Sequence, residues 1–497
     1  MQLQFHKEEV PCLRNLLTRV QTLEQTQEVT VEEGRDGAEI LGIWGQVLLR
    51  TKERQGDRLR ITGGIPVRVL LGGAEGQEPA CLETWIPFRL DWDLPGDAGE
   101  GTDRVLPVLA SLDARWTGAG KLLIRAGISA LAECWQASVA ALPHPVDVPE
   151  DVALQTQRWP VWLPREVGEK TFSLEETLSL PSSEPAVEKI LYYRLSPGIT
   201  DRKVVGNKVV FRGNAGLHLC WLCAGGKVHS WDVELPFSQY AELTGSYSPD
   251  ARTQVLSAVT RLELEKSETG ELILQAGLTG QYLVEERQLL ETVTDAYSPR
   301  RSVETVQENL AVPAVLEERR EMLHAEQALP LELGGAADMA VLTDLPRMGR
   351  QGDRTTMEVP QRCRILYYDD QGILRGTEHR WSQSLELESG ENSRITALPE
   401  PARTRLLPGM EGAVLDAELP LTLRTQAGTG LPAVTALTLG EAVQPDPGRP
   451  SLILRRAGTD TLWELARRSG STVEAICRAN GLEGEPEPER MLLIPVI

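Results

Sequence analysis

The sequence lacks the signatures of several large classes of protein. Its 497 residues contain no long apolar run, and a transmembrane helix needs about 20 such residues. The first nine residues, Met1 to Glu9, lack the basic and apolar regions of a signal peptide, which predicts no Sec-type export. The net charge of −21 argues against nucleic acid and against an anionic membrane surface, since both need a basic footprint. The sequence therefore predicts no nucleic-acid ligand and no membrane insertion.

Catalytic and metal-binding motifs are missing as well. The patterns G-x-x-x-x-G-K-S/T, H-E-x-x-H and G-x-S-x-G do not occur. The seven cysteines are scattered and odd in number, which is typical of buried thiols in a reducing compartment. Cys220 and Cys223 have the spacing of metal ligands, but residues three apart in a strand point to opposite faces. We predict no catalytic residue, no metal and no cofactor, and hence no enzyme.

A pattern that recurs after 150 residues runs through the first part of the chain. A fainter third copy places His229 and Trp231 opposite His379 and Trp381, and places residues 219–222 opposite 365–368. These matches predict three homologous domains. The pairs offset by 150 residues are Ile40-Leu41 with Ile190-Leu191, Leu59–Gly63 with Val209–Gly213, and Lys121–Ile128 with Glu271–Leu278.

The three repeats have the residue pattern that is typical of β-strands. Leucines 419, 421 and 423 alternate with other residues, as expected of half-buried strands, and Gly and Pro separate such segments. One segment differs, because its apolar residues have helical spacing and follow Pro11; they are Leu13, Leu16, Leu17, Val20 and Leu23. We therefore predict a mainly β protein in which three repeated antiparallel domains precede a small C-terminal unit.

Domain boundaries follow from composition. The predicted units are an amphipathic helical segment at 1–30, β repeats at 31–141, 150–300 and 335–443, and a C-terminal domain at 451–497. Segments rich in proline, glycine or alanine mark the linkers, which are Leu142–Pro149, Leu333–Ala337 and Gln444–Pro450.

The C-terminal 47 residues, 451–497, predict a β-α-α-β unit. Strands are expected at Leu452–Leu454 and Met491–Pro495. The first helix has Thr461 and Glu464 as its capping box and buries Leu462, Leu465 and Ala466. The second has Ser471 and Glu474 as its box and buries Val473, Ile476 and Cys477. Gly470 and Gly481 are expected to end the helices in the left-handed conformation.

This unit resembles a LysM domain through three stretches: Gly458 to Trp463 (GTDTLW), Ala479 to Leu482 (ANGL) and Leu492 to Pro495 (LLIP). The resemblance implies a ligand groove between the turn before the first helix and the loop after the second. Thr459 replaces the usual glycine and Leu454 the usual aromatic residue, which argues against glycan binding. The candidate binding residues are Gly458, Thr459, Asp460, Thr461, Leu462, Trp463, Asn480, Gly481 and Leu482.

Trp463 has two interpretations. It follows Leu462, so it lies about 100° further round the helix, at the border of the buried stripe. A partly covered tryptophan is a favoured anchor in interfaces. A small domain short of apolar volume can equally use it in its core.

The whole chain resembles the SipL/SpoVID group of spore-envelope morphogenetic proteins. The resemblance rests on the repeats, including the strand Trp231 to Phe237 (WDVELPF), and on the LysM-like tail. It implies SPOCS-type repeats and a location in the mother-cell cytoplasm at the forespore surface. It also implies that the tail binds a basement-layer protein of the spore coat, and the repeats other coat proteins. The alternative is a wall or cortex protein that binds peptidoglycan or N-acetylglucosamine polymers.

Overall fold

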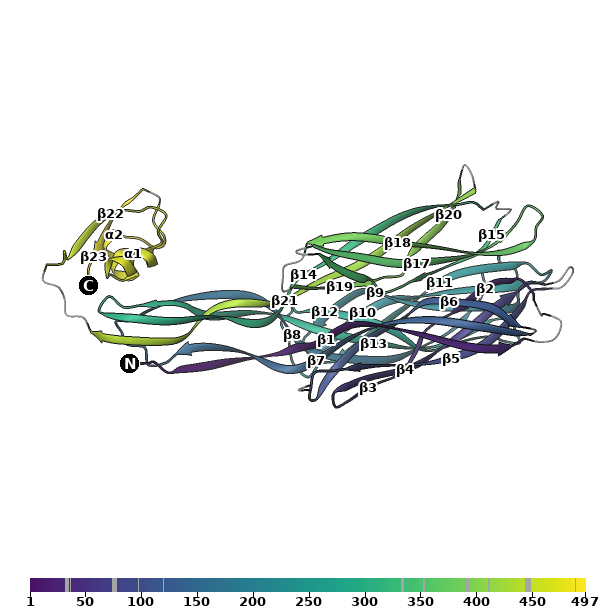
Figure 1. The fold of residues 1–497 in the computed structure, drawn as a ribbon, viewed down its shortest axis with the longest axis horizontal. Helices are drawn as coiled ribbons and strands as arrows, with labels where there is room; N and C mark the ends of the chain where they lie inside the picture. Colours follow the sequence, from purple (N-terminus) through teal and green to yellow (C-terminus); the bar gives the residue numbers. More distant parts are fainter. Residues whose placement is uncertain are drawn as a thin grey trace.

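The computed structural model describes residues 1–31, 35, 37–73, 78–96, 98–118, 120–331, 335–351, 354–388, 393–409, 412–442, 448–487 and 489–497. The fold is mainly β, as predicted, with two short helices near the C-terminus. Figure 1 shows an elongated head, a thinner stalk and a C-terminal unit at the end of the stalk.

The strands before the C-terminal unit fall into three consecutive sets, one for each predicted repeat. The first and third sets begin at residues 5 and 301, earlier than the predicted repeat bounds of 31 and 335. The first set is β1 (Phe5–Thr30), β2 (Ile40–Gly45), β3 (Leu48–Gln55), β4 (Arg58–Leu71), β5 (Ala80–Asp93), β6 (Gly101–Gly118) and β7 (Lys121–Pro145). The second is β8 (Ala153–Leu178), β9 (Val187–Val205), β10 (Lys208–Cys223), β11 (Val228–Glu242), β12 (Arg252–Lys266) and β13 (Leu272–Tyr297). The third is β14 (Arg301–Leu329), β15 (Gly335–Thr343), β16 (Arg347–Gln351), β17 (Arg354–Tyr368), β18 (Leu374–Glu388), β19 (Ser393–Pro399), β20 (Arg403–Gly409) and β21 (Gly412–Ala442).

Each set forms two antiparallel sheets of the same design. The long sheets have the orders β1-β7-β6, β8-β13-β12 and β14-β21-β19, with β20 also pairing with β21. The shorter sheets have the orders β2-β4-β3, β9-β10-β11 and β15-β17-β16, with β5 and β18 added to β4 and β17. In the first and second sets the inner faces of the two sheets enclose the main cores. This repetition is the structural counterpart of the offset of 150 residues.

The stalk consists of the outer ends of the three longest strand pairs, β1/β7, β8/β13 and β14/β21 (Figure 1). Side chains from all three pairs share its core. Those buried near the head are Cys12, Ala140, Leu142, Val161, Leu163, Leu290, Val312, Ala314 and Leu431. Each repeat therefore contributes one ribbon of two strands to a common rod.

The predicted helix at residues 1–30 is wrong, because residues 5–30 form β1 and pair with β7 along its whole length. A β-bulge between Asn15 and Leu17 shifts the alternation of the strand. Leu16 and Leu17 are both partly buried as a result, and this produces the apparent helical spacing. From Gln21 onward, half-buried and exposed residues alternate strictly, as in a strand.

Two of the predicted linkers contain strand residues. Leu142–Pro145 belong to β7, and residues 335–337 begin β15. Residues 333 and 334 of the second linker, and 444–447 of the third, lie outside the described residues. Prolines 143 and 145 fit in β7 at the end of the stalk, where proline is tolerated because a strand edge or end loses little by missing an N–H group.

The third repeat aligns with the second in a different register from the one we predicted for the histidines. Leu222 pairs with Val228 beside one hairpin turn, and Tyr368 pairs with Leu374 beside the other. Leucine 374 therefore corresponds to Val228, and His379 corresponds to Val233 rather than to His229. The predicted match of 365–368 with 219–222 agrees with this hairpin register.

Cys220 and Cys223 point into different cores, as their spacing predicts. Cys220 packs with Trp44 and Tyr192, and Cys223 packs in the core of the second repeat. Burial raises the pKa of the Cys220 thiol well above its usual value. Cys220 is therefore a neutral, unreactive thiol at physiological pH.

A polar group whose centre is buried joins the second repeat to the third. The ring nitrogens of His218 lie 2.7 Å from a carboxylate oxygen of Asp232 and 2.8 Å from one of Asp338, and Tyr192 also hydrogen-bonds to both His218 and Asp338. Burial alone would lower the pKa of His218, but the two carboxylates outweigh it and raise the pKa to about 9. His218 is therefore protonated at neutral pH, and its ion pair with Asp338 links β10 to β15.

Candidate ligand groove of the C-terminal unit

The C-terminal unit has the predicted β-α-α-β order. Its elements are β22 (Leu452–Arg456), α1 (Leu462–Ser469), α2 (Val473–Asn480) and β23 (Met491–Pro495). The strands pair antiparallel, with Ile453 opposite Ile494. The core contains the predicted residues Leu462, Leu465, Ala466 and Ile476, together with Leu492 and Ile494 from β23.

The helix ends mostly follow the sequence prediction. Thr461 and Glu464 form the predicted capping box of α1. Gly470 and Gly481 follow the helices with φ of 62° and 61°, in the left-handed region. The prediction for α2 is wrong by one residue, because Thr472 is the N-cap and accepts a hydrogen bond from the backbone N–H of Ala475. Ser471 is instead fully buried beside the end of α1.

The two sides of the predicted groove lie next to each other. The backbone N–H of Leu462 donates a hydrogen bond of 2.9 Å to the carboxylate of Glu485, which lies in the loop after α2. This contact satisfies one of the free N–H groups at the start of α1, where a carboxylate is also favoured by the helix dipole. An acidic residue of the loop after α2 thus joins the two sides of the predicted groove.

The side chains of Asp460 and Asn480, the two most polar candidates, form hydrogen bonds within the unit. Arg468 binds both carboxylate oxygens of Asp460 at 3.0 and 3.1 Å, and Arg455 binds one of them at 3.0 Å. The side-chain amide of Asn480 donates to the carbonyl oxygen of Leu493 at 2.6 Å and accepts from its N–H at 2.8 Å. Both side chains hold the unit together.

The other candidates form the rim. Gly458, Thr459 and Gly481 are exposed, and Leu482 is half-buried against the core. Leu482 also donates its N–H to the carbonyl oxygen of Cys477, which completes the end of α2. The exposed candidates therefore present mainly backbone groups and threonine side chains.

Trp463 packs against the stalk. Its ring meets that of Tyr297, the last residue of β13, edge-on with centroids 4.7 Å apart. The indole N–H donates a hydrogen bond of 2.9 Å to the carboxylate of Asp295, and Arg467 forms an ion pair of 2.6 Å with the same oxygen. Tyr297 is buried there, which raises its pKa to about 12. Trp463 is thus half-buried in a contact within the chain.

Sequence reasoning missed the partners of Trp463. Asp295 and Trp463 are 168 residues apart, and Asp295 lies at the end of a strand that showed no signal of its own. Arg467 lies one turn after Trp463 on the same face of α1. Its positive charge is the one local feature that indicates an acidic partner for this face.

None of the helices among the described residues is long and apolar enough to cross a membrane. Within the same residues, no group of three or more His, Cys, Asp or Glu side chains is arranged to hold a metal ion.

Comparison with known protein families gives two matches. A family model described as "SipL, SPOCS domain" matches residues 186–267, and a LysM domain model matches residues 459–495. No curated protein and no solved structure matched the chain. The first match spans β9 to β12 in the second repeat, and the second spans α1, α2, β23 and all the groove candidates except Gly458.

A SPOCS domain implies association with the spore coat, and a LysM domain implies peptidoglycan binding. Both are binding domains without catalytic function. The chain thus carries a SipL-type SPOCS domain and a C-terminal LysM domain, the combination by which its sequence resembles the SipL/SpoVID group.

Proposed function

We propose that the chain is a non-enzymatic scaffold of spore-coat assembly whose LysM domain docks a basement-layer coat protein. It acts in the mother-cell cytoplasm at the forespore surface, and its three β repeats bind further coat proteins. The supporting geometry is the position of the LysM domain at the end of a stalk, remote from most of the head (Figure 1). A rod of this kind holds the docking unit at a fixed distance from the head.

One observation carries the choice of a protein ligand over a glycan. The polar groups expected to bind a sugar are already used within the chain: Asp460 by two arginines, Asn480 by β23, and the N–H of Leu462 by Glu485. The aromatic side chain that could stack on a sugar ring, Trp463, lies against Tyr297. A protein partner can use the remaining backbone and apolar rim without these groups.

The second candidate is binding of peptidoglycan or another N-acetylglucosamine polymer, and the LysM match favours it. Gly458, Thr459 and Gly481 are exposed, so their backbone groups face solvent at the rim and can meet a glycan chain. The two candidates therefore share one groove and differ in the chemistry of the ligand.

Thr459→Arg tests the proposal, because an arginine at this exposed rim position blocks the groove without entering the core. We expect purified full-length variant protein to lose at least about tenfold in affinity for the basement-layer protein, a change of about 1.4 kcal/mol. The wild-type chain should not pellet with purified peptidoglycan. Thr177→Arg, the same change at an exposed position on β8, is the matched control and should bind like wild type.

Unchanged binding of Thr459→Arg to the basement-layer protein would rule out the groove as the docking site. Strong pelleting of the wild-type chain with peptidoglycan, lost in Thr459→Arg and kept in Thr177→Arg, would instead establish the glycan function.

A further inference from the structure

At three places among the described residues, the side-chain amide of a glutamine or an asparagine closes the edge of a sheet. Gln46 donates to the carbonyl oxygen of Leu195 at 2.6 Å and accepts from its N–H at 2.9 Å. Gln281 forms the same pair with Val105 at 2.7 and 2.9 Å, and Asn480 forms it with Leu493. Each amide occupies the place that another strand would take. An edge blocked in this way cannot serve as a template for pairing with a second chain.

The LysM sheet has one edge closed and one edge open. The sheet has two strands, β22 and β23, and Asn480 covers the outer edge of β23 at Leu493. Because Asn480 lies on the side away from β22, the N–H and C=O of Leu493 point away from β22. In an antiparallel pair, residues directly opposite each other have the same orientation, and Leu454 is opposite Leu493. The N–H and C=O of Leu454 therefore point outward, at an edge that no strand of the described residues covers.

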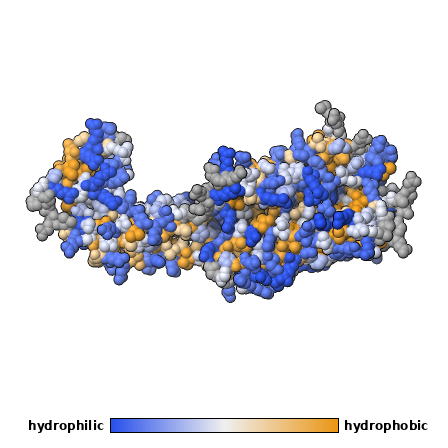
Figure 2. Space-filling model, in the orientation of Figure 1, coloured by the Kyte–Doolittle hydropathy of each residue, from blue (hydrophilic) through white to orange (hydrophobic). Residues whose placement is uncertain are grey.

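The open edge carries apolar side chains. Leu454 is 62% exposed and Leu452 is 52% exposed, and both lie on the face of the sheet away from the helices. Met491 and Leu493 of β23 share this face and are 48% and 39% exposed. Figure 2 shows a hydrophobic patch on the outer side of the C-terminal unit. An apolar edge strand without proline or an unpaired charge is the kind that recruits another strand.

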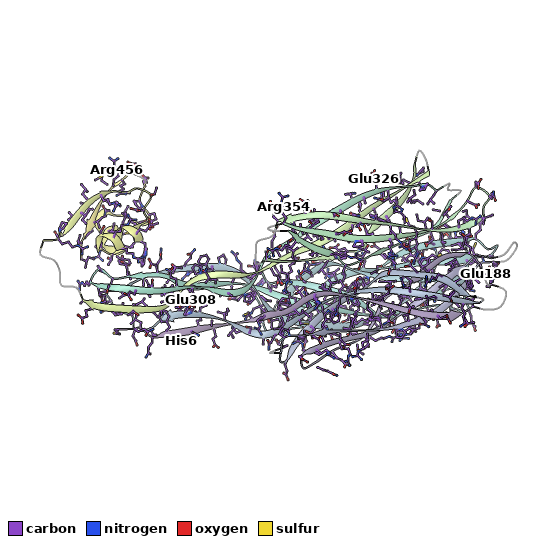
Figure 3. All side chains as sticks on the ribbon, viewed as in Figure 1. His6, Glu188, Glu308, Glu326, Arg354 and Arg456 are labelled. Carbon is purple, nitrogen blue, oxygen red and sulfur yellow. The ribbon has the colours of Figure 1, made fainter. Side chains whose placement is uncertain are left out.

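The strand is complementary to itself. If two copies of β22 pair antiparallel about Leu454, a two-fold axis places Leu454 opposite Leu454 and Leu452 opposite Arg456. The arginines do not repel one another strongly, since Arg455 pairs with Asp460 and Arg456 with Glu489 at 2.7 Å within each copy. The apolar faces of the two copies then form one continuous surface. Figure 3 shows Arg456 on the far side of the unit from the stalk, where a second copy can approach.

We propose that the open edge of β22 binds β22 of a second copy of this chain, which joins two LysM domains through a four-stranded antiparallel sheet. The contact is two-fold symmetric and closes on itself, so it gives dimers and not filaments. A single pair of short strands buries less than the roughly 1,200–2,000 Å² of a standard stable interface, so the dimer is weak and reversible. It doubles the number of docking units in one assembly, which strengthens attachment to a surface by avidity.

The test uses sedimentation velocity of the full-length protein over a wide range of concentration. Wild type should show a reversible equilibrium between monomer and dimer. Leu454→Pro removes the outward N–H and leaves a smaller but still apolar side chain, and proline is tolerated where the N–H faces solvent. We expect it to weaken the dimer about tenfold or more. Leu493→Lys is the matched control, because it adds a charge to the same face but leaves the edge of β22 intact, and it should keep the dimer.

Circular dichroism checks that both variants fold. A wild-type chain that stays monomeric at the highest concentration overturns the proposal. So does a Leu454→Pro variant that dimerises like wild type, or a loss of dimer in Leu493→Lys alone, which would mean that the apolar faces stack without strand pairing.

Discussion

Replacing Glu285 by alanine is expected to destabilise the protein by about 3–5 kcal/mol, the usual cost of breaking a buried ion pair on one side. Glu285 of β13 pairs with Arg424 of β21, and both side chains are almost fully buried. Burial already lowers the pKa of Arg424 to about 9. Removal of Glu285 leaves this guanidinium without its closest countercharge, in a region that water does not reach.

The effect should spread through all three repeats. Gln254 of the second repeat accepts hydrogen bonds from Arg424 at 2.7 Å and from Arg104 of the first repeat at 3.3 Å. It also donates one of 2.6 Å to Glu318 of the third repeat, and Arg104 pairs with the buried Glu133. The junction of the three long sheets is therefore one polar network, and a fault in one pair disturbs the others.

Thermal and urea unfolding of the purified chain measure this effect. Glu291→Ala is the matched control, since Glu291 lies on the same strand and pairs with Arg158 at the surface. We expect less than about 1 kcal/mol for it, as for other exposed pairs. The double variant Glu285→Leu/Arg424→Leu should recover much of the lost stability, because it buries no unpaired charge. An equal, small effect of Glu285→Ala and Glu291→Ala would contradict the role of the junction.

Reversing the charge of Asp295 is expected to release the LysM domain from the stalk. In Asp295→Arg, the indole of Trp463 loses its hydrogen-bond acceptor, and Arg467 faces a second positive charge in place of its partner. The remaining contact is the edge-on packing of Trp463 on Tyr297 and a few apolar neighbours. With only this packing left to hold it, the domain is expected to move away from the stalk.

Small-angle X-ray scattering should show a larger radius of gyration for Asp295→Arg than for wild type. Hydrogen exchange should increase at the end of β13, where Tyr297 becomes exposed. Glu308→Arg is the control, because Glu308 is exposed on the same stalk (Figure 3) and lies on β14 away from the LysM domain. Identical scattering of all three proteins would mean that Asp295 does not hold the domain.

Local patterns in the sequence predicted the regular parts of the fold. Alternation at Leu419, Leu421 and Leu423 identified strand β21, and the offset of 150 residues identified the first two repeats. In the C-terminal unit, Thr461, Glu464, Gly470 and Gly481 act within one helical turn, so their roles were predictable from spacing alone.

What the sequence did not predict depends on contacts between distant residues or on irregular strands. The bulge at Asn15 imitated a helical stripe, and nothing within the segment shows that β7 is its partner. Arg424 pairs with Glu285 of another repeat. Trp463 contacts Asp295 and Tyr297 of another domain. The closure of strand edges by Gln46 and Gln281 is equally remote in sequence.

The sequence predicted that the two sides of the candidate groove lie next to each other, but it did not predict what their polar side chains bind. The turn before α1 and the loop after α2 do meet, through Leu462 and Glu485. Sequence spacing could not show that Asp460 and Asn480 bind partners within the unit. Asp460 binds arginines of β22 and α1, and Asn480 binds the backbone of β23, and these elements come together only in the fold. That these residues bind a ligand stays a prediction.

The measurement that tests the proposed function most directly is the location of a fluorescent fusion in sporulating cells. The full chain should form a ring around the forespore, and a chain that lacks residues 448–497 should be diffuse in the mother cell although its β repeats stay folded. A diffuse signal for the full chain, or a signal confined to vegetative cells, would contradict a scaffold that docks on the forespore through its LysM domain.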